Sequence, residues 1–302
     1  MPNPATVVPV YGNYHGYYSK RPSVNDPRLA LLPSTLFHGR RVLDVGCNEG
    51  WVTCEIAQRL RAKRVIGVDV DDTLVRLAWK HRRFVWSQQG PPPEDDQAEG
   101  HDYNSRPSAS RKRRRSSQSV DNGPVSGTPD YFPAACEHIF GPLPIPDATG
   151  HAGASDTFPH NIAFRTADWV NTTIPDDAEK YHVVLAFSIS KWIHLNGGDE
   201  GIMTFFRRVY EVLEPDGVFV LEPQEWDTYA KARRMDPKLK ENAKHLKLRP
   251  DDFGRLLQDI GFGPATHLGS PGEGGKQCIY SDRLIQSDGA LCRVQTASRP
   301  IH

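Results

Sequence analysis

The sequence lacks the features that mark several classes of protein. No apolar run reaches the roughly 18 residues of a membrane-spanning helix, and the first 18 residues have neither the basic start nor the apolar stretch of a secretory signal. The five cysteines are odd in number, scattered and never paired as CxxC, which argues against a disulfide scaffold or a zinc ribbon. We therefore expect a soluble intracellular protein without a metal site.

Net charge is also absent, because 37 Lys and Arg residues balance 37 Asp and Glu residues. No global field then favours nucleic acid or membrane. Apolar residues make up only 38% of the chain, which is low for one packed domain of 302 residues. The sequence therefore predicts that part of the chain does not join the core.

The apolar deficit is concentrated in residues 87–159, which hold 11 of the 25 prolines and no helical or strand period. Such a composition buries too little apolar surface to offset the entropy of ordering, so we expect a disordered insertion. Its basic run at 111–115 is a solvated charge run, a nuclear-import signal or a nucleic-acid tether. Residues 1–86 and 160–302 remain for a single domain.

Outside the insertion, short apolar runs alternate with helical patterns. The runs at 41–45, 64–69, 161–165, 182–187 and 218–221 predict strands, and the patterns at 50–61, 72–86, 198–213 and 250–260 predict helices. Continuous Val, Ile and Leu strands between helices indicate a mostly parallel sheet covered on both faces. We expect a doubly wound α/β fold that binds its ligand at the carboxyl ends of the strands.

The first strand runs into the segment DVGCNEG at 44–50, and a helix follows directly. A dinucleotide fold would carry GxGxxG to offer amides to a pyrophosphate, but here GxxxG stands alone and follows Asp44. Asp69 ends the next strand, where a carboxylate can accept both hydroxyls of a ribose. An acidic strand end suits a ligand with an ammonium group and no phosphate, such as S-adenosylmethionine. The alternative is a structural tight turn.

Four segments make the chain resemble the RNA methylphosphate capping enzymes: 11–18 continuing through Arg21, 43–50, 185–196 followed by 198–201, and 221–226. The resemblance covers 11–262 outside the insertion. It implies a Rossmann-like class I methyltransferase fold with a seven-stranded sheet and S-adenosyl-L-methionine as cofactor. It also implies methyl transfer to the 5′-terminal γ-phosphate of a small non-coding RNA, which forms a methylphosphate cap.

The resemblance further implies roles for individual residues. Lys191 and His194 would lie at the methyl acceptor, with Lys191 holding the non-reacting phosphate oxygens; a surface lysine and a core histidine are the alternatives. No general base is needed, because the acceptor oxygen is already anionic. Weaker candidates for the phosphates are Tyr14 and Lys20. The residues expected to bind the cofactor are Tyr11, Arg21, Gly46, Asn48, Asp69, Val70, Asp168, Trp169 and Phe187.

Residues 231–249 carry eight Lys and Arg residues against two acidic ones, and they follow Trp226 and Tyr229. Phosphate contacts with aromatic stacking commonly hold RNA ends, so Lys238 and Lys244 become candidate RNA contacts; a solvated helix is the alternative. Two other functions stay open: methylation of 5′-monophosphate RNA, and an RNA-binding ribonucleoprotein subunit with dispensable catalysis. We expect a protein that is monomeric apart from RNA complexes, with ribonucleoprotein partners, in the nucleus or alternatively the cytoplasm.

Overall fold

The computed structural model describes residues 8–18, 25–88, 140–147, 154–269 and 277–281. The chain divides into two compact units. The first holds the described residues up to Arg83 and from Ile145 onwards, and the second holds those from Phe84 to Pro144. Residues 89–139 and 148–153 lie outside the described residues, so the disorder predicted for the insertion stays a prediction, as does the role of its basic run.

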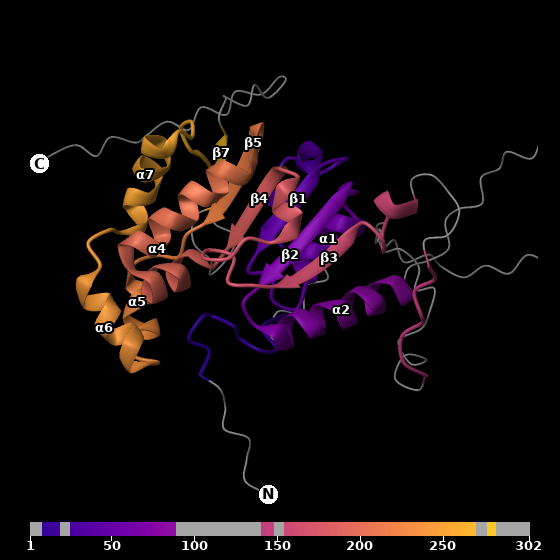
Figure 1. Cartoon of the computed structure of the whole chain (residues 1–302), viewed down its shortest axis with the longest axis horizontal. Helices are drawn as coiled ribbons and strands as arrows, with labels where there is room; N and C mark the ends of the chain where they lie inside the picture. Colours follow the sequence, from indigo (N-terminus) through magenta and orange to yellow (C-terminus); the bar gives the residue numbers. More distant parts are fainter. Residues whose placement is uncertain (1–7, 19–24, 89–139, 148–153, 270–276, 282–302) are drawn as a thin grey trace, which may run out of the picture. The chain divides into compact units, whose positions relative to one another are not determined.

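Seven strands form one sheet in the order β3-β2-β1-β4-β5-β7-β6 (Figure 1). β1 to β5 run parallel, and β7 pairs antiparallel with both β5 and β6. The prediction of a mostly parallel, doubly wound sheet of seven strands is confirmed, and this order is that of the class I methyltransferase fold. The strands are β1 Arg41–Val45, β2 Arg64–Asp69, β3 Ile162–Thr166, β4 Tyr181–Phe187, β5 Leu213–Glu222, β6 Thr266–Gly269 and β7 Gln277–Ser281.

The helices connect parallel strands on both sides of the boundary between β1 and β4. From β1 the chain proceeds through β2 to β3 at one edge of the sheet, and from β4 it proceeds in the opposite direction to β5. Since parallel crossovers are right-handed, α1 and α2 cover one face and α4 covers the other. The helices are α1 Trp51–Gln58, α2 Asp72–Ser87, α4 Ser190–Val212, α5 Asp227–Ala232, α6 Pro237–His245 and α7 Phe253–Ile260, and no described helix is long and apolar enough to span a bilayer.

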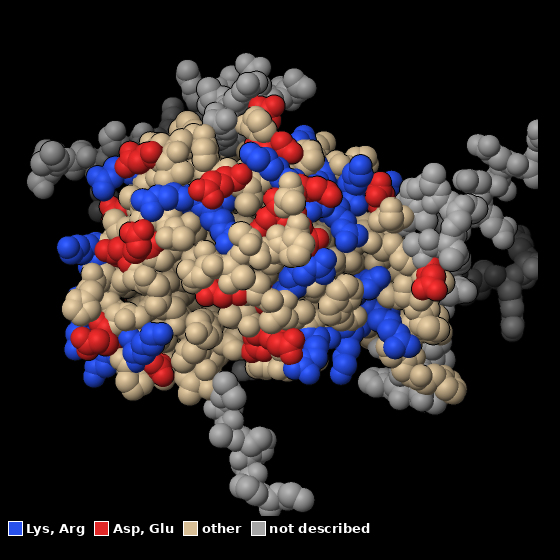
Figure 2. Space-filling model, in the orientation of Figure 1, with Lys and Arg blue, Asp and Glu red and all other residues tan. Residues whose placement is uncertain are grey.

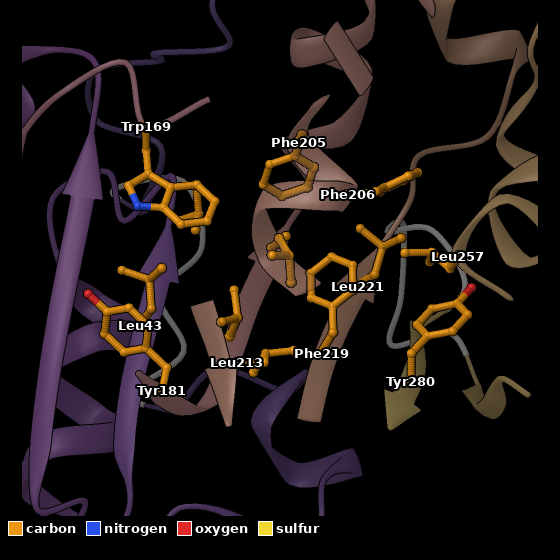
Figure 3. Close-up of a cluster of buried hydrophobic side chains, with 14 of the residues drawn as sticks. Leu43, Trp169, Tyr181, Phe205, Phe206, Leu213, Phe219, Leu221, Leu257 and Tyr280 are labelled. Atoms are coloured by element: carbon orange, nitrogen blue, oxygen red, sulfur yellow. The ribbon is translucent and has the colours of Figure 1, made fainter. Parts of the chain in front are cut away.

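The second half of α4 buries the apolar face that its spacing predicts. Ile202, Phe205, Phe206 and Val209 are fully buried. Phe205 and Phe206 both lie edge-on against Phe219 of β5 (Figure 3). Burying each such side chain stabilises the fold by about 1.5–3 kcal/mol relative to exposure. This cluster fixes α4 on the sheet and thereby fixes the residues at its first turns.

Two predicted element starts differ from the structure by five residues or more. α4 begins at Ser190 rather than 198, because the apolar cluster around Trp192 and Leu195 supports an earlier helical segment. β5 begins at Leu213, five residues before the predicted start, since the turn at 215–217 bulges out of a ladder that Leu213 already enters opposite Tyr181.

Candidate active site

A cavity of about 470 Å³ lies at the carboxyl ends of β1, β2 and β4. The sheet order reverses between β1 and β4, and doubly wound sheets bind their ligands at such a point. Nine of the residues predicted from the sequence line this cavity: Tyr11, Gly46, Asn48, Asp69, Val70, Asp168, Trp169, Phe187 and Lys238.

The loop between β1 and α1 turns tightly against β2. Gly46 has φ 79°, and its N–H donates to the carbonyl oxygen of Val68 at 2.8 Å. A Cβ atom at Gly46 would lie 2.3 Å from a side-chain carbon of Ile189. Because neither the conformation nor the space admits a side chain, glycine is required here for the backbone to border the cavity.

Asp69 ends β2 with its carboxylate held in place by backbone amides. The N–H of Asn48 donates to its Oδ2 at 2.9 Å, and the N–H of Asp71 donates to its Oδ1 at 3.0 Å. Only 8% of Asp69 is exposed, and this burial raises its pKa, although the amide hydrogen bonds act in the opposite direction. Each carboxylate oxygen has a further lone pair, so an oriented pair of acceptors borders the cavity.

Asp44 lies at the end of β1 and is only 3% exposed. The hydroxyl of Thr53 donates to its Oδ2 at 2.6 Å, and burial raises the pKa of Asp44 to about 6. The charged side chains lining the cavity are four carboxylates and two cations: Asp44, Asp69, Asp168 and Glu200 against Arg28 and Lys238. The lining therefore favours a ligand that carries positive charge.

Arg28 is a buried cation that the sequence reasoning missed. Its guanidinium lies 4.7 Å from the ring centre of Phe187 and donates to Glu222 Oε2 at 3.1 Å. It also forms a paired contact with Asp26, at 2.8 and 2.6 Å. Two carboxylates thus already engage Arg28, which leaves the acidic character of the cavity intact.

Asp168 and Trp169 follow β3 but differ in their surroundings. Asp168 is exposed and accepts a hydrogen bond from the side-chain amide of Asn171 at 2.8 Å. Trp169 is 2% exposed, donates to Asp177 at 3.2 Å and points into the core beside Phe205 (Figure 3). Trp169 therefore meets the cavity from the core side, and Asp168 meets it from the solvent side.

Residues 8–18, here called the N-terminal strap, border the cavity through Tyr11, Gly12 and Asn13. Asn13 Nδ2 donates to Asp71 Oδ2 at 2.7 Å, and Asn196 Nδ2 donates to the carbonyl oxygen of Val10 at 2.8 Å. The strap is thus attached to both sides of the sheet's switch point. Lys20 and Arg21 lie outside the described residues.

Lys191 lies next to the cavity without lining it. Its ammonium donates to Thr228 Oγ1 at 3.2 Å and lies 5.2 Å from the ring centre of Trp192. Burial lowers the pKa of Lys191, although Asp227 acts in the opposite direction. Its two successors in α4, Trp192 and Ile193, do line the cavity.

The structure places His194 in the core and not at the cavity, where it was predicted to lie. Its ring is fully buried, between Tyr229 and Phe253, and does not line the cavity. Nε2 lies 2.8 Å from Asp199 Oδ1, and Nδ1 lies 3.3 Å from the hydroxyl of Tyr229. This face of α4 packs against α5 and α7, so His194 does not reach an acceptor in the cavity.

The basic segment 231–249 comprises the end of α5, all of α6 and the turns on either side of α6. Lys238 lines the cavity, whereas Lys244 is exposed and pairs with Glu241 at 2.6 Å. Tyr14 packs edge-on against Trp192. Over the face that Figure 2 presents, Lys and Arg side chains are interspersed with Asp and Glu.

The two aromatic residues before this segment are engaged within the protein. Tyr229 is 2% exposed, and the ring of Trp226 lies 4.6 Å from that of Tyr229 and 3.8 Å from the guanidinium of Arg249. Burial keeps Tyr229 from stacking on RNA bases, whereas stacking by the partly buried Trp226 stays a prediction.

The family model for Bicoid-interacting protein 3 (Bin3) matches residues 181–286. The chain is 34% identical over 86% of its length to the human 7SK snRNA methylphosphate capping enzyme, of which it covers 37%. It is 31% identical, again over 86% of its length, to a probable RNA methyltransferase of Arabidopsis thaliana, of which it covers 74%. The chain belongs to the Bin3 family.

The chain is also similar to the pre-miRNA 5′-monophosphate methyltransferase of Danio rerio, with 24% identity over 80% of this chain and 78% of that protein. Some residues that line the cavity lie in the segments that carry the family resemblance, and others do not. Trp192 and Asn196 stand inside the 185–196 segment that carries the resemblance. Arg28 has no such signal, since a lone arginine before an apolar run reads as surface.

Proposed function

We propose that this Bin3-family chain is a methyltransferase that uses S-adenosylmethionine to methylate the 5′-terminal γ-phosphate of a small non-coding RNA. The observation that carries the proposal is the acidic cavity at the sheet's switch point. S-adenosylmethionine has an ammonium and a sulfonium group and no phosphate, so it suits a lining of four carboxylates and two cations.

The residues around the cavity fit this cofactor. Asp69, with both oxygens oriented by amides, would accept the ribose hydroxyls, and Val70 follows it at the same edge. Asp44 would face the ammonium group. Gly46 and Asn48 bring the backbone close to the ligand. Phe187, Asp168 and Trp169 also line the cavity, and we propose that they contact the cofactor. Tyr11 and Arg21 would cover its amino-acid end. When bound, the cofactor supplies an electrophilic methyl group.

The protein's part in the reaction is then to orient and to exclude water. A terminal phosphate oxygen is anionic at neutral pH, so no side chain needs to remove a proton. An anion and a sulfonium lose charge as they react, and a partly dehydrated site favours that step. Lys191, half-buried beside Trp192, would hold the non-reacting oxygens, with Lys238, Tyr14 and Lys20 toward the rest of the RNA end. We propose no contact between His194 and substrate, because its ring is buried and both ring nitrogens have partners.

One methyl-transfer assay tests the proposal. A single short RNA is prepared with a 5′-triphosphate, a 5′-monophosphate or a 5′-hydroxyl end and incubated with labelled S-adenosylmethionine. We expect transfer to the triphosphate and none to the hydroxyl. Preferential transfer to the monophosphate would favour the second candidate, which is the activity named for the Danio rerio relative. RNA binding without transfer to any end would favour a ribonucleoprotein subunit.

Modification of a small nuclear RNA would take place in the nucleus, and the basic run at 111–115 is the candidate import signal. The human relative's name contains snRNA, which supports this location. Replacing all five residues of the run with glutamine in a fluorescent fusion should move the protein to the cytoplasm. An unchanged distribution would separate the run from import.

A further inference from the structure

Helix α4 is interrupted where it borders the cavity. Gly198 has φ 69° and ψ −168°, which is not helical. The last carbonyl groups of a helical segment have no partner within that segment. At this break the partner comes from α6, since Asn242 Nδ2 donates to the carbonyl oxygens of Leu195 at 2.9 Å and Asn196 at 3.2 Å. One side chain of α6 thus satisfies the end of α4's first segment.

The second segment of α4 is joined to the chain after α6. Asp199, directly after the break, accepts the N–H groups of Lys247 at 3.0 Å and Leu248 at 3.3 Å. It also lies 2.8 Å from Nε2 of His194. Burial lowers the pKa of His194, so the neutral ring donates through Nε2 to the carboxylate and accepts through Nδ1 from Tyr229. The carboxylate therefore has three donors in fixed positions.

Together these contacts tie the break in α4 to the C-terminal half of α6 and to the chain that follows it. We call them the α4–α6 joint, which consists of Leu195, Asn196, Asp199, Asn242, Lys247 and Leu248. Lys238 precedes Asn242 by four residues, so both lie on one face of α6. Lys238 lines the cavity together with Asn196, Gly197 and Glu200 from the break. No hydrogen bond or ion pair of its ammonium occurs within the described residues, whose gaps are given above.

We propose that Asn242 and Asp199 are positioning residues: the α4–α6 joint holds Lys238 at the cavity, where its ammonium binds a phosphate of the RNA 5′ end. The inference rests on the proposed function, because it needs an anionic acceptor. The apolar cluster that also holds α6, formed by Trp192, Leu195, Tyr229, Ala232, Leu239 and Leu246, does not depend on these polar contacts. The joint can therefore be weakened without removing the cluster.

The test is a double-variant cycle on binding, which needs no turnover. Dissociation constants are measured for one oligonucleotide with a 5′-triphosphate and with a 5′-hydroxyl, in the presence of S-adenosylhomocysteine. Lys238→Ala and Asn242→Ala should each weaken triphosphate binding by about ten- to a hundredfold, the range for one hydrogen bond to a charged group. In a protein that already carries Lys238→Ala, Asn242→Ala should change binding by less than about twofold, because the effects of two coupled residues do not add.

The control is Lys240→Ala, an exposed lysine on α6 that does not line the cavity. In that background the full effect of Asn242→Ala should persist. If Asn242→Ala fails to fold, as judged by thermal melting, Asp199→Asn takes its place, because it keeps the shape of the side chain and removes the charge that holds the joint.

Two negative results have different meanings. Wild-type protein that prefers the triphosphate, with equal effects of Asn242→Ala in the presence and absence of Lys238, would overturn the joint's role alone. Wild-type protein that binds both ends equally would overturn the proposed function and this inference with it.

Discussion

At the scale of single residues, Asp44 lines the cavity and also makes the stability of the fold depend on pH. Burial raises its pKa from 3.8 to about 6. As the pH rises, the unfolded chain releases this proton before the folded protein does. The contribution of protonated Asp44 to stability is therefore present below about pH 4 and is lost as the pH rises through 6.

Asp44→Asn removes that ionisation and keeps an oxygen for the hydroxyl of Thr53. The variant's free energy of unfolding, relative to wild type, should therefore increase by about 2–3 kcal/mol between pH 4 and pH 8. Denaturant unfolding of both proteins without cofactor, at pH 4, 6 and 8, measures this difference. Asp251→Asn, at an exposed position, serves as the control and should show little change. A pH-independent difference for Asp44→Asn would mean that folding does not raise the pKa of Asp44.

Asp69 offers a direct test of the ribose contact. Asp69→Ala should weaken S-adenosylmethionine binding by roughly 1.5–3 kcal/mol, because a hydrogen bond to a charged group has about that magnitude. Isothermal titration calorimetry gives the affinity. A melting curve checks that loss of the bonds from Asn48 and Asp71 has not opened the loop. Unchanged affinity in a folded variant would remove Asp69 from the ribose site.

At the scale of elements, the N-terminal strap should be separable from the core. Gly12 has φ 75°, and a Cβ atom there would lie 2.2 Å from Nε1 of Trp192. Gly12→Ala should therefore displace the strap and weaken cofactor binding while the melting temperature changes by little. Gly39→Ala is a matched control, since Gly39 also has positive φ but has open space around it. Equal cofactor affinities in the two variants would show that the strap does not cover the ligand.

The elements also show how far the sequence could be read. β1, β2 and β4 were predictable because they are buried on both faces and their Val and Leu runs are continuous. The break at Gly198 was not, because its cause is long-range: Asn242 and Asp199 bond across the chain to satisfy it. The cavity followed from the strand ends, whereas the buried state of His194 depends on how α4 packs against α5 and α7. The local sequence pattern thus predicts the strands, whereas tertiary contacts determine which way the side chains of α4 face.

At the scale of the whole molecule, the described residues that line the cavity come from both sides of the insertion. They fall at 11–70, 167–204 and 238. Replacing 89–139 with a short Gly-Ser linker should therefore leave the melting temperature and the affinity for S-adenosylmethionine nearly unchanged. Calorimetry of the shortened and full-length proteins makes the comparison. A drop of many degrees in melting temperature would contradict the composition argument, because the segment would then contribute to a core.

A chain of zero net charge has to bind a polyanion through local groups of cations. Without a global field, the salt dependence of RNA binding depends on the few cations that meet phosphates. Lys238, Lys240, Lys244 and Lys247 are exposed in and beside α6, but Lys244 already pairs with Glu241. Each lost contact lowers the log–log salt slope by about 0.7 for single-stranded RNA. Four full contacts would contribute nearly 3 to the slope, but Lys244 is already paired with Glu241 and contributes little. Changing all four lysines to glutamine should therefore lower the slope by about 2. Anisotropy titrations over a series of salt concentrations give the slopes, and a fourfold Lys→Arg variant, which keeps the charge, should retain the wild-type value. If the glutamine variant also keeps that value, α6 is a solvated helix and the RNA is held elsewhere.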